Sequence, residues 1–168
     1  IDSLEELRQA IAKYTTLASA KLRQYNQLTS AIKIFTTTNI YSKDFIKSET
    51  IGILNKPTDD TRIILKTSLE LTKKIFKPYR KLIKAGIILH KLQINKYQQN
   101  SLFESKDSER NFKQEGLNKV IDNINKRYGK HTLDWKSSVI ENDWNQRRNK
   151  LSFFKTTTME NIPIVFAH

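Results

Sequence analysis

The sequence contains no cysteine, which excludes disulfide bonds, thiolate nucleophiles and cysteine-based zinc sites. Four glycines in 168 residues are too few for most loops that cradle phosphates. No apolar run approaches the ~18 residues of a membrane span, and IDSLEELRQA at the start lacks the features of a signal peptide. We therefore expect a cytoplasmic protein without a membrane partner. Because the sequence begins with Ile1 rather than Met, we also expect a fragment or a processed product.

Positive charge, in contrast, is abundant and unevenly distributed. The formal net charge is +13, and residues 61–100 carry ten Lys or Arg and one acid, Glu70. Residues 1–60 carry eight basic and seven acidic residues. A block of this kind indicates a surface for a polyanion, most often nucleic acid. The alternative is a solvated face that only keeps the protein in solution.

Residues 2–27 predict a long amphipathic helix. Ser3 and Glu6 have the spacing of a capping box at its start. An apolar stripe recurs at helical spacing and consists of Leu4, Leu7, Ile11, Tyr14, Ala18 and Leu22.

Two strands are predicted after this helix. Residues 28–39 change to a period of two, and residues 50–56 predict a second strand that pairs with the first in the antiparallel sense. The first strand is expected to direct Ile32, Ile34 and Thr36 to one face and Lys33, Phe35 and Thr37 to the other. Pro57 is expected to end the second strand.

Residues 57–76 predict a second helix. Thr58 is the expected N-cap, and Asp59 and Asp60 are then expected in the first turn, where the helix dipole favours negative charge. Two adjacent acids also suggest a metal site, but the capping interpretation is favoured by their position. Pro78 is expected to end the helix.

Residues 81–94 predict a third strand. The run Ile87–Leu89 makes it apolar on both faces, which favours a central position covered on both sides. The small residues Ala85 and Gly86 allow another group to approach the backbone closely. The order helix-strand-strand-helix-strand up to residue 94 predicts the α+β class. It corresponds to a βαββαβ sandwich whose first strand is missing from the chain.

The C-terminal part predicts a connector, a helix and a small module. Residues 95–107 are polar and are expected to link two units. Residues 108–128 predict a further helix, with Gly129 as its C-terminal stop. Residues 130–168 have aromatic residues without a clean period, which predicts an irregular module with short strands.

Residue patterns for catalysis are missing. His90, His131 and His168 are scattered and lack the spacing of zinc ligands. The carboxylates are not paired in the way that metal-dependent nucleotidyl transfer requires. We therefore expect no metal site, no cofactor and no catalytic activity in this chain alone.

The basic block and the threonines of the first strand point to DNA. Phosphate contacts position a duplex without reading its sequence, and no stretch has the Gly-aromatic signature of RNA-recognition sheets. This pattern favours binding to the backbone of a duplex over the reading of a single strand. The candidate DNA-binding residues are Lys33, Thr36, Thr37, Thr38, Asn39, Lys73, Lys74, Arg80, Lys81, Lys84 and Lys91.

A family resemblance extends over essentially the whole chain. It is carried by SAIKIFTTTN, PTDDTRIILKTSLELTKKIF, LIKAGIILHKL, QNSLF, INKRYG, NDWNQRRNKLS and TTTMENIPIV. In order and spacing these motifs resemble UmuC-type Y-family DNA polymerases, the catalytic subunit of DNA polymerase V. The resemblance implies a little finger domain over residues 1–94 and a linker over 95–107. It implies the small C-terminal domain of this subfamily over 108–168.

The resemblance also implies a role. A little finger grips the phosphate backbone of duplex DNA during error-prone translesion synthesis in the SOS response, and the match assigns that role to Lys84 and the TTTN hairpin. The parent polymerase uses Mg²⁺, but its metal-binding carboxylates lie in domains that this chain lacks. The sliding clamp is an implied partner, with a UmuD-type accessory subunit and RecA as further partners.

A short stretch in the connector has its own signature. YQQNSLFES, residues 97–105, places Leu102 and Phe103 among polar residues, with no apolar partner at helical or strand spacing. Within it, QNSLF resembles the clamp-binding pentapeptide, with Gln99, Ser101 and the Leu-Phe pair at the matching positions. The alternative is a loop whose Leu-Phe pair packs on its own domain.

Two other hypotheses remain from the sequence. In the first, the chain is a truncated, stand-alone, non-catalytic protein that binds DNA or regulates the damage response. In the second, it is a basic nucleic-acid-binding module with no polymerase parent. The coding region upstream of Ile1 would separate the first from a polymerase fragment. DNA binding without clamp binding would favour the second.

Overall fold

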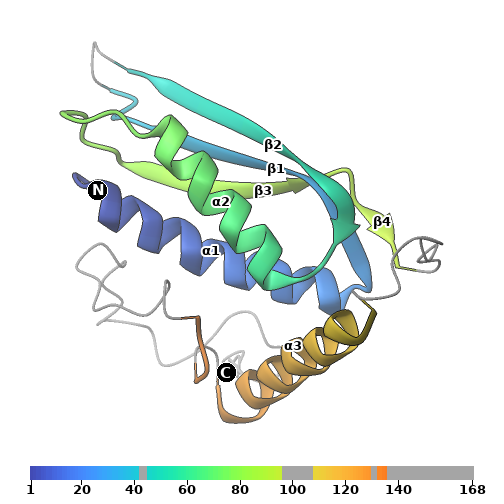
Figure 1. Ribbon diagram of the computed structural model, residues 1–168. Helices are drawn as coiled ribbons and strands as arrows, with labels where there is room; N and C mark the ends of the chain where they lie inside the picture. The colour runs from blue at the N-terminus through green and yellow to red at the C-terminus, as the bar shows by residue number, and fades with distance from the viewer. Residues whose placement is uncertain (42–44, 96–107, 130–131, 136–168) are drawn as a thin grey trace, which may run out of the picture.

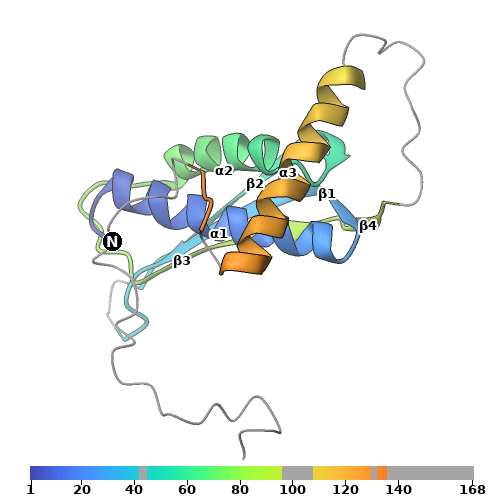
Figure 2. The same ribbon diagram turned by 90° about the horizontal axis from the view of Figure 1, so that it is seen from below.

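The computed structural model describes residues 1–41, 45–95, 108–129 and 132–135, with the side chains of the last helix from residue 116 onward. The elements, in chain order, are α1 (Leu4–Gln24), β1 (Gln27–Thr37), β2 (Lys47–Thr58), α2 (Thr61–Ile75), β3 (Lys84–His90), β4 (Gln93–Ile94) and α3 (Ser108–Tyr128). Helices α1 and α2 cover one face of the sheet, and α3 crosses α1 on the side away from the sheet (Figures 1 and 2). The predicted α+β class is confirmed.

β1 is the central strand of the sheet. It pairs in the antiparallel sense with β2 on one side and β3 on the other, and the short β4 pairs with its start. The prediction of a central β3 is therefore wrong, and Ile88 on this strand is 42% exposed. Only the alternate residues Ile87 and Leu89 pack against the core, so the apolar run reflects one buried face and one exposed isoleucine.

The sheet has one face against the helices and one open face. Ile32 and Ile34 of β1 are completely buried in the core, which confirms the predicted period of two. On the open face, Phe35 of β1 lies over Gly86 of β3, where a Cβ atom would come within 2.6 Å of the ring. The close approach that small residues predicted at this point is therefore made by Phe35.

α1 begins as the sequence predicted. Ser3 is the N-cap, and its Oγ accepts a hydrogen bond from the Glu6 N–H at 3.1 Å. The Glu6 carboxylate accepts in turn from the N–H of Asp2 at 2.9 Å. Leu7 and Ile11 of the apolar stripe are completely buried, so this part of the pattern directs α1 toward the sheet. Tyr14, predicted in the same stripe, is 37% exposed, and Thr15 is buried in its place.

The boundary between β2 and α2 differs from the prediction. β2 continues through Pro57 to Thr58, because an edge strand tolerates a proline. The N-cap of α2 is Asp60 and not Thr58, since Asp60 Oδ1 accepts from the Arg62 N–H at 2.9 Å. Thr58 Oγ1 instead accepts from the N–H of Asp60 at 3.1 Å. Asp59 therefore precedes the helix and does not lie in its first turn.

Arg23, in the last turn of α1, joins three parts of the molecule. Its Nε and Nη2 donate to the two carboxylate oxygens of Asp122 on α3, at 2.6 and 2.9 Å. Its Nη1 donates to the carbonyl oxygen of Asp59 and to Thr61 Oγ1, both at 2.8 Å. Asn118, one turn earlier on α3 than Asp122, is buried. One guanidinium group thus ties α1 to the start of α2 and, through a bidentate pair, to α3.

Replacing Arg23 by Lys should loosen α3 although the positive charge is kept. An ammonium group cannot reproduce the fork that meets both oxygens of Asp122. We expect a loss of about 1.5–3 kcal/mol, the usual range for hydrogen bonds to charged groups. It should appear as faster amide hydrogen exchange in α3 and a lower denaturant midpoint. Arg62→Lys, in an exposed pair with Asp60, is the control and should change stability by less than ~1 kcal/mol. Unchanged exchange in α3 of the R23K variant would contradict this role.

Candidate nucleic-acid interface

Six of the ten positive charges of the basic block gather at one end of the sheet. β1 ends there, β2 and β3 begin there, and α2 ends beside them (Figure 1). We call this region the basic end and define it as Lys47, Lys73, Lys74, Lys77, Arg80, Lys81 and Lys84. No acid occurs between positions 73 and 84 of the sequence, so this segment does not neutralise its own charge.

The register of the sheet brings separate parts of the basic end together. Thr37 of β1 lies opposite Lys47 on β2 and opposite Lys84 on β3. The three strands therefore form a row across the sheet in which Thr37 lies between Lys47 and Lys84. Sequence reasoning did not select Lys47, because the predicted second strand began at residue 50, whereas β2 begins at Lys47. The register of the sheet was also needed to place Lys47 across from Thr37.

The hairpin beside this row is closed by its own polar groups. Thr38 donates its N–H to the carbonyl oxygen of Ile46 at 3.1 Å, and Thr38 Oγ1 accepts from the Ile46 N–H at 2.8 Å. Asn39 Oδ1 accepts from the N–H of Tyr41 at 3.0 Å, which leaves the amide NH₂ of this exposed residue directed at solvent or a ligand. These bonds hold the TTTN segment in a fixed shape next to the basic end.

Most of the candidate DNA-binding residues meet at this end. They are Thr37, Thr38, Asn39, Lys73, Lys74, Arg80, Lys81 and Lys84. Lys91 does not, since it follows the last residue of β3 at the opposite end of the strand. Thr36 is 3% exposed and faces the helix side of the sheet, so its hydroxyl is not on the outer surface. Lys33 lies on the open face and is engaged by an acid.

That acid is Glu49, which is held between two lysines. Lys33 Nζ lies 2.8 Å from Glu49 Oε2, and Lys47 Nζ lies 3.3 Å from the same oxygen. The hydrogen bond from Lys33, followed by that from Lys47, holds the pKa of Glu49 below its usual value. Glu49 is therefore ionised at neutral pH and offsets part of the positive charge next to the basic end.

The open face of the sheet is otherwise apolar near its middle. Lys33 has Ile51 opposite on β2 and Ile88 opposite on β3, and both isoleucines are exposed. Ile53, further along β2, is 72% exposed. Groups able to donate hydrogen bonds to phosphates are thus concentrated at the basic end and are sparse on the open face.

The described residues contain no cluster of three His, Asp or Glu side chains placed to hold a metal ion. No helix in these ranges combines the length and the apolar character needed to cross a bilayer. The predicted clamp-binding residues Gln99, Ser101, Leu102 and Phe103 lie outside the described residues.

Replacing Glu49 by Gln should strengthen binding to a polyanion. The change removes the negative charge that Lys33 and Lys47 share and leaves both ammonium groups for phosphates. We expect duplex DNA affinity to rise about two- to fivefold at low salt and the gain to shrink as salt is added, as for an exposed ion pair. Fluorescence anisotropy measures this directly. Glu70→Gln on α2 removes the same charge elsewhere; an equal gain in that control would mean that net charge alone is responsible.

Comparison with known proteins gives matches along the chain. The family model described as impB/mucB/samB family C-terminal domain matches residues 1–102. A second model, described as Domain of unknown function (DUF4113), matches residues 115–165. The two matches together extend over most of the chain.

Curated relatives match over almost the full length of this chain. Protein MucB of Salmonella typhimurium is 30% identical over 166 residues, which are 98% of this chain and 38% of the relative. Protein UmuC of Salmonella typhimurium strain LT2 is 28% identical over 159 residues, 94% of this chain and 37% of the relative. Protein MucB of Escherichia coli is 30% identical over 166 residues, and this chain spans 38% of its length. The chain belongs to the impB/mucB/samB family and corresponds to the C-terminal part of a UmuC-type Y-family DNA polymerase.

Proposed function

We propose that this chain holds duplex DNA by its phosphate backbone as the C-terminal part of an error-prone translesion polymerase of the SOS response. The observation that carries the proposal is the basic end, where six Lys or Arg residues between positions 73 and 84 meet Lys47 and the TTTN hairpin. Membership in the family of a DNA polymerase supports the same conclusion.

The chemistry of the basic end suits a role without sequence preference. Six of its seven cations are lysines, which act as compact point charges and contact phosphates without fixed geometry. Phosphate contacts set the position and orientation of a duplex and carry no sequence information. A polymerase that copies damaged DNA must hold any sequence, so contacts of this kind are what the task requires.

In this proposal the chain contributes binding and not the chemical step. Nucleotidyl transfer needs paired metal-binding carboxylates, and the sequence has none in such an arrangement. The Mg²⁺ of the reaction would be held by other domains of a full-length polymerase. This chain spans 38% of the length of its MucB relatives, which leaves room for such domains in proteins of that kind.

We also propose that the connector docks on the sliding clamp. The pentapeptide QNSLF offers Leu102 and Phe103 for an apolar cleft and Gln99 for a hydrogen bond at its rim. The support is the sequence itself: the apolar pair has no partner at helical or strand spacing, so the connector does not bury it by a local helix or strand pattern, and QNSLF resembles the clamp-binding pentapeptide. A clamp tether of this kind raises the local concentration of the polymerase at the primer end.

The chain should bind duplex DNA with a steep dependence on salt concentration. Replacing Lys81 and Lys84 together by Gln should weaken binding roughly tenfold at low salt, because two phosphate contacts are lost. The slope of log affinity against log salt should flatten by about two. The double variant Lys21→Gln with Lys66→Gln, both exposed residues outside the basic end, is the control. An equal effect of the two double variants would contradict the assignment of the interface.

Replacing Leu102 and Phe103 together by Ala should abolish clamp binding. Each side chain contributes roughly 1.5–3 kcal/mol if it is fully buried, so the combined loss should exceed a factor of about 100 in affinity. Surface plasmon resonance on immobilised clamp measures it. Tyr97→Ala, an apolar truncation two residues before the pentapeptide, is the matched control. Unchanged clamp binding by the double variant would mean that the pair packs on its own domain.

A further inference from the structure

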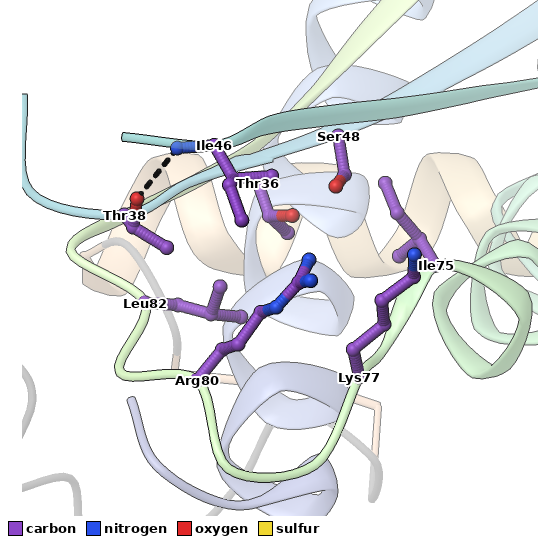
Figure 3. Close-up of a pocket in the computed structure, with 8 residues that line it drawn as sticks. All are labelled: Thr36, Thr38, Ile46, Ser48, Ile75, Lys77, Arg80 and Leu82. Atoms are coloured by element: carbon purple, nitrogen blue, oxygen red, sulfur yellow. Dashed lines mark hydrogen bonds between the residues drawn. The ribbon is translucent and has the colours of Figure 1, made fainter. Parts of the chain in front are cut away.

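A small cleft opens at the basic end, on the helix side of the sheet (Figure 3). It is lined by Thr36, Thr38, Ile46, Ser48, Ile75, Lys77, Arg80 and Leu82. The cleft has a volume of ≈ 10 Å³, which is enough for about one water-sized group. Its walls combine apolar side chains, hydroxyl groups and two cations.

The floor of the cleft is formed by two hydroxyl groups. Thr36 of β1 and Ser48 of β2 lie directly opposite each other in the sheet. Figure 3 shows both side chains pointing into the cleft. In the part of the chain that the structure describes, neither residue makes a side-chain hydrogen bond. Two hydroxyl donors in a confined space without partners are a site for an oxygen acceptor.

The mouth of the cleft is formed by two cations on one turn. Pro78 and Tyr79 are the central residues of this turn, which brings the flanking Lys77 and Arg80 close together. Tyr79 has φ +68°, in the left-handed region that non-glycine residues adopt uncommonly. Its side chain is fully exposed and gains nothing from burial. Figure 3 shows the guanidinium of Arg80 directed at the two hydroxyls.

The two cations are not neutralised by an acid of the described ranges. Within these ranges, neither Lys77 nor Arg80 makes an ion pair or a side-chain hydrogen bond. The last turn of α2 adds partial negative charge close by, which would oppose an anion. Lys73 and Lys74 lie in that turn and offset this effect. The local field at the cleft is therefore positive.

We propose that this cleft binds a single phosphate group. One oxygen enters the floor and accepts hydrogen bonds from Thr36 and Ser48, and the other oxygens stay at the mouth. There they meet the fork of Arg80, whose geometry matches a phosphate, and the ammonium of Lys77. The inference rests on the donors of the cleft and does not require duplex DNA to bind at the rest of the basic end.

The test titrates the 168-residue chain with inorganic phosphate at constant ionic strength and follows backbone amide shifts by NMR. The expected result is a saturable shift of the amides of Thr36, Ser48 and Arg80. Arg80→Gln should weaken phosphate binding roughly tenfold, as expected for a charge-assisted pair, and Ser48→Ala should weaken it several-fold. Lys66→Gln, which removes one positive charge from an exposed site on α2, should leave it unchanged.

A second arm identifies the source of the phosphate. Duplex DNA of equal length with and without a terminal phosphate is added to the chain, with inorganic phosphate as competitor. If backbone phosphates occupy the cleft, inorganic phosphate should displace both duplexes and Arg80→Gln should weaken both. If a terminal or free phosphate is the ligand, only the phosphorylated duplex should respond. Either result supports the cleft as a phosphate site and assigns its ligand.

Three outcomes would overturn the proposal. The first is a shift that grows linearly with phosphate and does not saturate. The second is an equal loss in Arg80→Gln and Lys66→Gln, which would reduce the effect to net charge. The third is an unchanged affinity in both Arg80→Gln and Ser48→Ala. Since Ser48→Ala removes one oxygen atom from a partly exposed residue, it should fold normally and keeps the test decisive.

Discussion

The central position of β1 is the constraint on which the rest of the structure depends. Because β1 pairs with β2 and β3 at once, residues that lie far apart in the sequence become neighbours across it. Thr37 is flanked by Lys47 and Lys84 on the surface, while Thr36, one residue earlier, faces Ser48 on the other side. The alternation of a single strand thus supplies both the outer row of the basic end and the floor of the phosphate cleft.

A second constraint ties the C-terminal helix to this body. Arg23 lies in the segment that matches the impB/mucB/samB C-terminal domain, and Asp122 lies in the segment that matches the domain of unknown function. The bidentate pair therefore links the two matched segments directly. The same guanidinium group of Arg23 also donates to Asp59 and Thr61 at the start of α2. Through Arg23, α3 is therefore connected to the helix whose last turn carries Lys73 and Lys74. This arrangement connects α3 to the helix that ends at the basic end.

The sequence by itself determined the local elements and the sign of the charge. Ser3 and Glu6 mark the start of α1 because a cap depends on residues a few positions apart. The alternation around Ile32 and Ile34 defines β1 because the period of a strand is local. The basic block was equally visible, since composition needs no fold. Local signals failed where the surrounding structure sets the boundary of an element. Pro57 does not end β2, because an edge strand tolerates a proline, and Asp60 caps α2 in place of Thr58.

The tertiary structure decided which residues act together. A run of three apolar residues in β3 is consistent with a central or an edge strand. Only the pairing of β1 with both β2 and β3 shows that β1 is the central strand and that β3 lies beside it. The pair of Arg23 and Asp122 joins residues 99 positions apart. The cleft likewise combines Thr36 and Ser48 with a turn that contains Arg80. No periodicity or spacing encodes such contacts, because they arise from the packing of whole elements and not from the preferences of short segments.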